Sequence, residues 1–136
     1  MASTSNPKLI STAVGRRKTS VAFVRMYSNK EESTVNGKPI SQYFPGVIAK
    51  TQLQLPFQAV EVTGKYSASV KVSGGGPRGQ LDAVVLGLAR ALVVANAKFK
   101  PALRLAGLLT RDPRERQRRM VGTGGKSRRK KQSPKR

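Results

Sequence analysis

The stretch that decides the fold runs from Tyr66 to Ala95 and reads YSASVKVSGGGPRGQLDAVVLGLARALVVA. Its first part alternates apolar and polar residues as far as Val72, which predicts a half-buried strand. Three glycines follow, and then Pro77, a residue that suits the first position of a helix. Beyond it, apolar residues recur at helical spacing: Leu81, Val84, Val85, Leu88, Leu92 and Ala95. A strand, a glycine turn and a long amphipathic helix predict a domain of mixed secondary structure.

The long helix is expected to end near Pro101. Lys98 and Lys100 lie close to that end, where positive charge is favourable to the helix dipole. A short apolar helix is then expected over Ala102–Leu109. The following segment, Asp112-Pro113-Arg114-Glu115, matches a capping box with proline at the first helical position. It predicts the start of a brief helix whose side chains are almost all cationic.

Upstream of Tyr66 the patterns are shorter. Alternation over Val21–Tyr27 predicts a strand with one face more buried than the other. Asn36-Gly37 is the strongest hairpin signal of the chain and predicts a turn between two short strands. A helical turn is expected through Val47–Leu55, and a further strand over Phe57–Val62.

Positive charge dominates the composition. The 136 residues include 27 Lys and Arg against 6 Asp and Glu, which gives a net charge of +21, while apolar residues make up only 38%. A folded monomer with this imbalance repels itself unless a polyanion neutralises it. Nucleic acid is the natural polyanion, because cationic side chains that replace condensed counterions on phosphates gain affinity.

The charge is concentrated at the C-terminal end. Residues 111–136 hold 12 basic and 2 acidic residues, with Met120 and Val121 as their only apolar side chains. Such a segment buries too little surface to offset its ordering entropy, so we expect it to be disordered until it binds a partner. The expected domains are therefore a flexible segment at 1–11, a globular RNA-binding domain at 12–110, and a basic extension at 111–136.

Two cationic clusters are candidate contacts to RNA. Arg16-Arg17-Lys18 lies just before the first expected strand, at a break marked by Gly15, and is either an RNA contact or a solvated loop. The second cluster comprises Lys126, Arg128, Arg129, Lys130 and Lys131. A basic tail adds no solubility to a body that is already basic, so RNA contact is favoured there. The tail also lacks the apolar face that a membrane-surface helix requires.

The sequence argues against a catalytic site. With no cysteine and no histidine, it has no thiolate nucleophile, no cysteine-held zinc and no histidine base. Asp82 lies near the start of the long helix, where the helix dipole favours a negative charge. The carboxylates form no pair spaced for acid–base chemistry or a magnesium site, so no catalytic residue, metal or cofactor is expected. We also expect neither a signal or transit peptide nor a membrane span, hence a soluble intracellular protein.

The glycine turn before Pro77 has two interpretations. Glycine-rich turns between a strand and a helix can hold phosphate, but this one matches neither the Walker loop nor the dinucleotide fingerprint. In such turns glycines more often serve backbone conformations with positive φ or close approaches of the chain. The structural interpretation is favoured, and contact to an RNA backbone is the alternative.

Four segments carry a resemblance to a known family. They are Gly15-Arg16-Arg17-Lys18-Thr19-Ser20, the block from Asn36-Gly37-Lys38-Pro39 to Tyr43-Phe44, Gly74-Gly75-Gly76 leading to Gly79-Gln80 and Ala89-Arg90-Ala91-Leu92, and Leu108-Leu109-Thr110-Arg111-Asp112-Pro113-Arg114. In this order and spacing they resemble the small-subunit ribosomal protein nine family from about Thr12 to Arg136. Each motif alone is weak, whereas the four in order are highly specific.

The resemblance implies a fold, a location and partners. The implied fold is an α+β two-layer sandwich like the second domain of small-subunit ribosomal protein five, with an extended basic C-terminal tail. The implied location is the head of the small subunit, on the 3′ domain of its rRNA, near proteins ten and fourteen and less closely protein seven. The tail would reach peptidyl-site tRNA, with Lys135 and Arg136 at its tip.

We therefore expect the following rRNA-binding residues: Arg16, Arg17, Lys18, Arg78, Arg111, Arg114, Arg116, Arg118, Arg119, Lys126, Arg128, Arg129, Lys130 and Lys131. The chain departs from the bacterial pattern at its end, where Ser133-Pro134 stands in place of Phe-Ser before the final Lys-Arg pair. The aromatic that would stack on RNA is missing, but the terminal cations remain. The ending favours a bacterial or a plastid ribosome.

Two other functions are weighed against this one. A nucleotide-binding enzyme built on Gly74–Gln80 predicts saturable ATP binding, and the missing histidine and Gly-Lys-Ser/Thr motif argue against it. An architectural nucleic-acid protein outside the ribosome predicts equal affinity for duplex DNA. The composition hardly separates this second alternative from the ribosomal one, whereas the four ordered motifs do.

Overall fold

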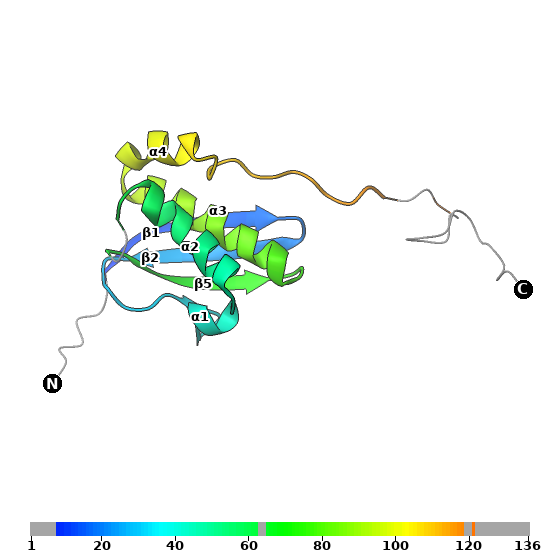
Figure 1. The fold of residues 1–136 in the computed structure, drawn as a ribbon, viewed down its shortest axis with the longest axis horizontal. Helices are drawn as coiled ribbons and strands as arrows, with labels where there is room; N and C mark the ends of the chain where they lie inside the picture. The colour runs from blue at the N-terminus through cyan, green and yellow to red at the C-terminus, as the bar shows by residue number, and fades with distance from the viewer. Residues whose placement is uncertain (1–7, 63–64, 119–120, 122–136) are drawn as a thin grey trace, which may run out of the picture.

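The structure is a computed structural model that describes residues 8–62, 65–118 and 121 (Figure 1). Its strands are β1 (Leu9–Arg17), β2 (Ser20–Tyr27), β3 (Thr34–Val35), β4 (Lys38–Pro39) and β5 (Ser67–Ser73). Its helices are α1 (Ile40–Tyr43), α2 (Val47–Ala59), α3 (Pro77–Ala95), the 3-10 turn η1 (Ala97–Phe99) and α4 (Lys100–Leu105).

The strands form one mixed sheet in the order β1-β2-β5-β3-β4. β2 lies between β1 and β5 and pairs antiparallel with both, so that Phe23 faces Val14 on one side and Lys71 on the other. β3 runs parallel to β5, and the Asn36-Gly37 turn joins it to β4 as expected. With helices packed on this sheet, the fold is α+β.

Helices cover one face of the sheet (Figure 1). On β2 the covered side chains are Ala22, Val24 and Met26, each 0% exposed. On β5 they are Ala68, Val70 and Val72, and α3 closes the core from above with Leu88 and Leu92 among its buried residues. The alternation expected over β2 and β5 is confirmed, and it selects the even-numbered residues for the core.

The close packing of α3 against the sheet depends on two glycines. A Cβ on Gly15 would lie 1.9 Å from the Ala83 carbonyl oxygen, and one on Gly87 would lie 2.7 Å from a Val24 methyl group. Backbone therefore packs on backbone, and the Ser11 hydroxyl donates to the Ala91 carbonyl at 2.9 Å across the same contact. Gly15 lies within β1 and is not the break expected before the first strand.

The glycine turn before α3 also has a structural role. Gly74 and Gly75 have φ values of 75° and 65°, in the left-handed region that favours glycine. A Cβ on Gly74 would lie 2.5 Å from the Thr19 carbonyl oxygen, and one on Gly75 would lie 2.1 Å from the Ser20 hydroxyl. The structural interpretation of this turn is confirmed for both residues.

Several elements differ from the expectations. The strand expected over Phe57–Val62 is wrong: α2 continues to Ala59, because Phe57 lies one helical turn after buried Leu53 and packs against the same core. β1 starts at Leu9, ahead of the expected domain start at Thr12, because Ser11 is held beneath α3.

The other differences concern the helices. α3 stops at Ala95 rather than near Pro101, because Asn96 is extended and its side chain accepts a bond from the Lys98 amide that begins η1. Pro101 instead lies in the first turn of α4, which ends at Leu105 and not near Leu109, since Gly107 two residues on has a φ of 75°. The brief cationic helix expected from Asp112 is wrong, since no residue of 111–118 is helical.

Candidate nucleic-acid interface

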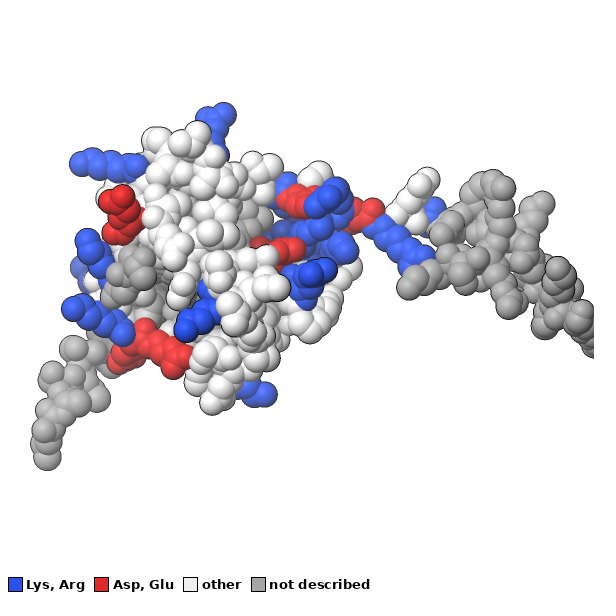
Figure 2. Space-filling model, viewed as in Figure 1, with Lys and Arg blue, Asp and Glu red and all other residues white. Residues whose placement is uncertain are grey.

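Three segments that are distant in sequence meet at one end of the molecule. They are the β1–β2 turn, the first turn of α3 and the segment that follows Thr110, and Figure 2 shows Lys and Arg gathered where the extension leaves the body. We call this region the cationic end and define it by six residues. They are Arg16, Arg17, Lys18, Arg78, Arg111 and Arg114.

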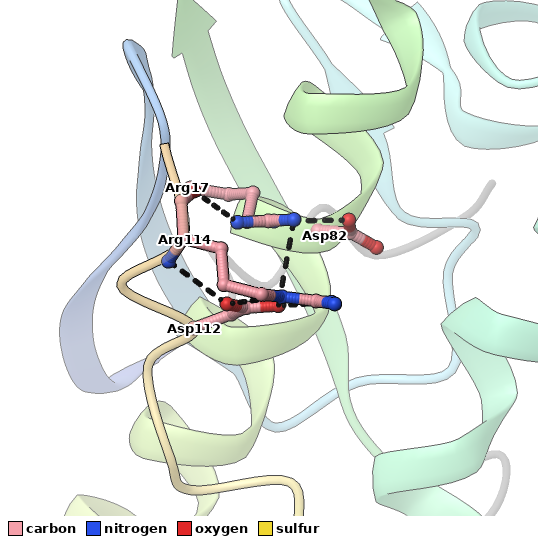
Figure 3. A network of polar contacts seen from close by, with 4 residues as sticks. All are labelled: Arg17, Asp82, Asp112 and Arg114. Carbon is pink, nitrogen blue, oxygen red and sulfur yellow. Dashed lines mark hydrogen bonds and ion pairs between the residues drawn. The ribbon is translucent and has the colours of Figure 1, made fainter. Parts of the chain in front are cut away.

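Arg17 joins the three segments (Figure 3). Its Nε lies 3.6 Å from Oδ2 of Asp82 on α3, and its Nη2 lies 3.4 Å from Oδ2 of Asp112. Its Nη1 also donates to the Arg114 carbonyl oxygen at 2.8 Å. The Arg17 side chain is only 13% exposed, so these contacts take up most of its donors.

Asp112 completes this group, which we call the clasp: Arg17, Asp82, Asp112 and Arg114. The Asp112 carboxylate accepts a bond from the Arg114 backbone amide at 3.0 Å and from the Arg114 guanidinium, with Nη2 at 2.7 Å. These bonds hold the pKa of Asp112 well below its usual range and raise the pKa of Arg114. The same bonds favour the ionised form of Asp112, so its carboxylate stays charged as the pH falls from neutrality through the ordinary carboxyl range.

No helix follows Asp112, although it makes the backbone bond of a cap: its carboxylate accepts from the Arg114 amide two residues on. The same carboxylate also binds Arg17 of β1 and the Arg114 guanidinium. Residues 111–114 are thereby tied to β1 and α3. The clasp contains two cations and two anions, so it fixes the path of the extension without adding net charge to the cationic end.

The remaining cations of the cationic end are open to solvent. Arg16, Lys18, Arg78 and Arg111 are all exposed, and none forms an ion pair with another residue of the described chain. α3 begins beside them, and with no acidic residue in its first turn its dipole adds partial positive charge. The arrangement suits the binding of phosphates along a polyanion.

Comparison with known proteins shows which family the chain belongs to. A profile described as Ribosomal protein S9/S16 matches residues 15–136. The chain belongs to this family. Its relatives named small ribosomal subunit protein uS9 include one from Cytophaga hutchinsonii, 46% identical over 81% of this chain and 86% of the relative. Others from Amoebophilus asiaticus and Maridesulfovibrio salexigens are each 41% identical over 83% of this chain, and over 88% and 87% of their own lengths.

Membership in the S9/S16 family settles the general function. The chain is a structural component of the small ribosomal subunit and is not an enzyme. No three Asp or Glu residues of the described chain gather as a metal site would require. No helix within residues 8–62 and 65–118 is long and apolar enough to cross a bilayer.

The structure places only part of the predicted S9/S16 interface. Arg16, Lys18, Arg78 and Arg111 lie on the three segments that meet there and have exposed side chains, while Arg17 and Arg114 are held in the clasp. Arg116 and Arg118 are exposed and follow the clasp along the extension. The remaining predicted contacts lie outside the described residues: Arg119, Lys126, Arg128, Arg129, Lys130, Lys131, Lys135 and Arg136.

The clasp was not predicted from the sequence. Asp82 was attributed to the dipole of α3, and Asp112 to a helix cap. Both assignments used local pattern alone, whereas the partner of each carboxylate is Arg17, which is separated from them by most of the domain. No local pattern marks such a pairing. The Asp112-Pro113-Arg114 motif, which is part of the family resemblance, was its only signal.

Proposed function

We propose that the cationic end binds small-subunit rRNA in the head of the subunit, and that the C-terminal residues contact peptidyl-site tRNA. In this proposal residues 12–110 form the RNA-binding body and residues 111–136 the extension. The observation that carries it is that the turn with Arg16 and Lys18, the start of α3 and the root of the extension meet, with the clasp holding that root in place.

The chemistry of these side chains fits RNA phosphates. Arginine offers a planar fork of donors that matches a phosphate, and lysine a compact charge, so the set positions a backbone without reading its sequence. The exposed cations are not neutralised by carboxylates of the described chain, so binding RNA releases counterions at each of them.

The tRNA contact rests on the family resemblance and on charge. Residues 111–136 carry 12 basic and 2 acidic residues, ending in Lys135 and Arg136. Because Ser133-Pro134 replaces the aromatic of the bacterial pattern, we propose a purely electrostatic contact at the tip. The proteins proposed as neighbours are ten and fourteen, with seven further away.

Fold kinship and origin are finer parts of the same proposal. The mixed sheet with helices on one face is consistent with a two-layer sandwich like the second domain of small-subunit ribosomal protein five. The relatives named uS9 come from bacteria, which favours the bacterial cytoplasm over a plastid. No membrane and no small-molecule substrate takes part in this function.

The rRNA contact is tested with the full chain and a transcript of the 3′ domain of small-subunit rRNA. The variant combines Arg16→Gln, Lys18→Gln and Arg78→Gln, and the matched control combines Lys38→Gln, Lys50→Gln and Arg104→Gln. Each lost phosphate contact should lower the slope of log affinity against log salt by about 1. Equal slopes for variant and control would refute the proposal that the cationic end binds rRNA. Equal affinity of the intact chain for duplex DNA would favour an architectural nucleic-acid protein.

The tRNA contact is tested in purified small subunits. Chains that end at Val121 should assemble into subunits but retain initiator tRNA in the peptidyl site more weakly than intact chains. A chain with only Lys135→Gln and Arg136→Gln should show a smaller loss. Retention that is unchanged by the truncation would rule out the tRNA part of the proposal and leave the rRNA part standing.

A further inference from the structure

The sheet has a second face that no helix of residues 8–62 and 65–118 covers. Because Ala22, Val24 and Met26 point into the core, the alternate residues of the strands point the opposite way. We call the resulting surface the open sheet face. It comprises Thr12, Val14 and Arg16 of β1, Val21, Phe23 and Arg25 of β2, and Ser69, Lys71 and Ser73 of β5.

The strand register places an aromatic ring among cations on this face. Phe23 is half-buried on the central one of the three strands and lies directly across from Lys71 on β5. Arg25 is two residues further along β2, and its guanidinium carbon lies 5.4 Å from the centroid of the Phe23 ring. The ring therefore already receives one planar cationic group on its exposed side.

All the charged residues of the open sheet face are cationic. Arg16, Arg25 and Lys71 are exposed, and none forms an ion pair in the part of the chain that the structure describes. None of the nine positions of the open sheet face carries an acidic residue. The surface is therefore complementary to an anion rather than to a mixed protein surface, where charges of both signs would be matched.

A hollow of about 550 Å³ lies beside the ring, between β2, β5 and the β3–β4 turn. Its lining includes Phe23, Lys71 and Asn36. Asn36 accepts a bond from the Val72 amide at 2.9 Å and donates to the Val72 carbonyl at 3.1 Å. These two bonds hold the turn against β5, so the wall of the hollow is fixed in advance of any ligand.

We propose that the open sheet face is a second RNA contact, which stacks an unpaired base on Phe23 and binds the adjacent phosphates through Arg25 and Lys71. A half-exposed aromatic ring on a sheet, flanked by arginine and lysine, offers a base both a stacking surface and counter-charge. The base takes the place over the ring where Arg25 lies, and the exposed guanidinium moves to a phosphate.

Single-stranded or bulged RNA fits this face better than a duplex, because paired bases hide their faces in the stack. Arg16 belongs both to this face and to the cationic end, since it pairs with Val21 at the end of β1. The two surfaces are thus continuous, and one RNA can run from phosphates at the cationic end to a stacked base at Phe23. This inference rests on the proposed rRNA binding and adds a site to it.

The absence of tryptophan from the chain allows a direct test. Phe23→Trp places a single tryptophan on the open sheet face, and Phe57→Trp places one at a half-buried position on α2, in the helical layer. The probe is a transcript of the 3′ domain of small-subunit rRNA added to the full chain. We expect base stacking to quench the fluorescence of Phe23→Trp, and the fluorescence of Phe57→Trp to change little.

Affinity provides the second readout. Phe23→Leu keeps apolar bulk but removes the stacking surface and should weaken binding about 5-fold or more. Arg25→Gln with Lys71→Gln should lower the salt slope by between about 1 and 2, while the control Lys50→Gln with Arg104→Gln leaves it unchanged. Circular dichroism shows whether each variant is folded, and the charge variants alter only exposed side chains.

The outcomes separate this inference from the proposed function. If the Arg16, Lys18 and Arg78 variant weakens binding while Phe23→Trp is not quenched and Phe23→Leu binds normally, the stacking site is overturned and the cationic end stands. If duplex RNA quenches Phe23→Trp as strongly as the rRNA transcript does, the stacking of an unpaired base is likewise refuted. If the intact chain does not bind the transcript at all, both proposals fall together.

Discussion

The two faces of the sheet are formed by the same strands but differ in their surroundings and in the roles we assign to them. On β2, Met26 is 0% exposed beneath the helices, while its neighbour Arg25 lies on the open sheet face over Phe23. Because successive side chains of a strand point to opposite faces, one run of residues supplies both the core and the proposed RNA-binding surface. Substitutions on the covered face should therefore change stability, and those on the open sheet face should change RNA binding.

The largest effect is expected where the covered face meets α3. Gly15→Val would force a side chain against the Ala83 carbonyl oxygen, which lies 1.9 Å from the position of a Cβ. Neither partner is a flexible side chain, so α3 must move off β1, and we expect a loss of stability of about 3 kcal/mol or more. Thermal unfolding followed by circular dichroism measures it. Gly76→Ser is the control, since a Cβ there meets nothing within 4 Å.

Adjacent residues of β2 give the most direct comparison of the faces. Met26→Ala removes a fully buried side chain and should cost about 2–5 kcal/mol in urea unfolding. Arg25→Ala should cost less than about 1 kcal/mol, because it loses only an exposed cation–π contact. Affinity for the rRNA transcript, measured under conditions where both are folded, should show the reverse order. The division of roles is wrong if Arg25→Ala lowers stability as much as Met26→Ala does.

A smaller effect is expected at the edge of β5. Asn36 combines a φ of 51° with two side-chain bonds to the Val72 backbone. Asn36→Ala loses both bonds and keeps an unfavourable φ, so it should cost about 2 kcal/mol. Asn36→Gly relieves the φ and should cost only about 1 kcal/mol in the same unfolding experiment. Equal losses for the two variants would mean that the backbone conformation contributes nothing.

The smallest effect on global stability is expected at the clasp, which belongs to neither face. Asp112→Asn keeps the shape of the side chain but removes the charge that binds Arg17 and Arg114. The unfolding midpoint should barely change, whereas trypsin should cut faster after Arg114 and Arg116 at neutral pH. Glu61→Gln makes the same charge change at an exposed position away from both cleavage sites and should leave the cleavage rate as it is.

How far the sequence predicts this fold depends on the kind of pattern. The alternation of β2 and β5, the turn at Asn36-Gly37 and the start of α3 at Pro77 were all expected and are confirmed. Each of these signals is local, either a hydrophobic period or a turn residue. β1 had no such signal, because α3 lies so close to it that its covered face holds Ser11, Ala13 and Gly15 in place of large apolar residues.

The candidate site divides in the same way. The surplus of 21 positive charges, its concentration after residue 110 and the ordered family motifs are properties of the sequence alone, and they are enough to identify a ribosomal protein that binds RNA. Only the tertiary structure decides which cations remain exposed and which are held in the clasp. It also decides that Phe23 faces solvent between Arg25 and Lys71. The reason is that ion pairs and sheet registers join residues far apart in the chain, and the geometry that brings them together exists only once the core has formed.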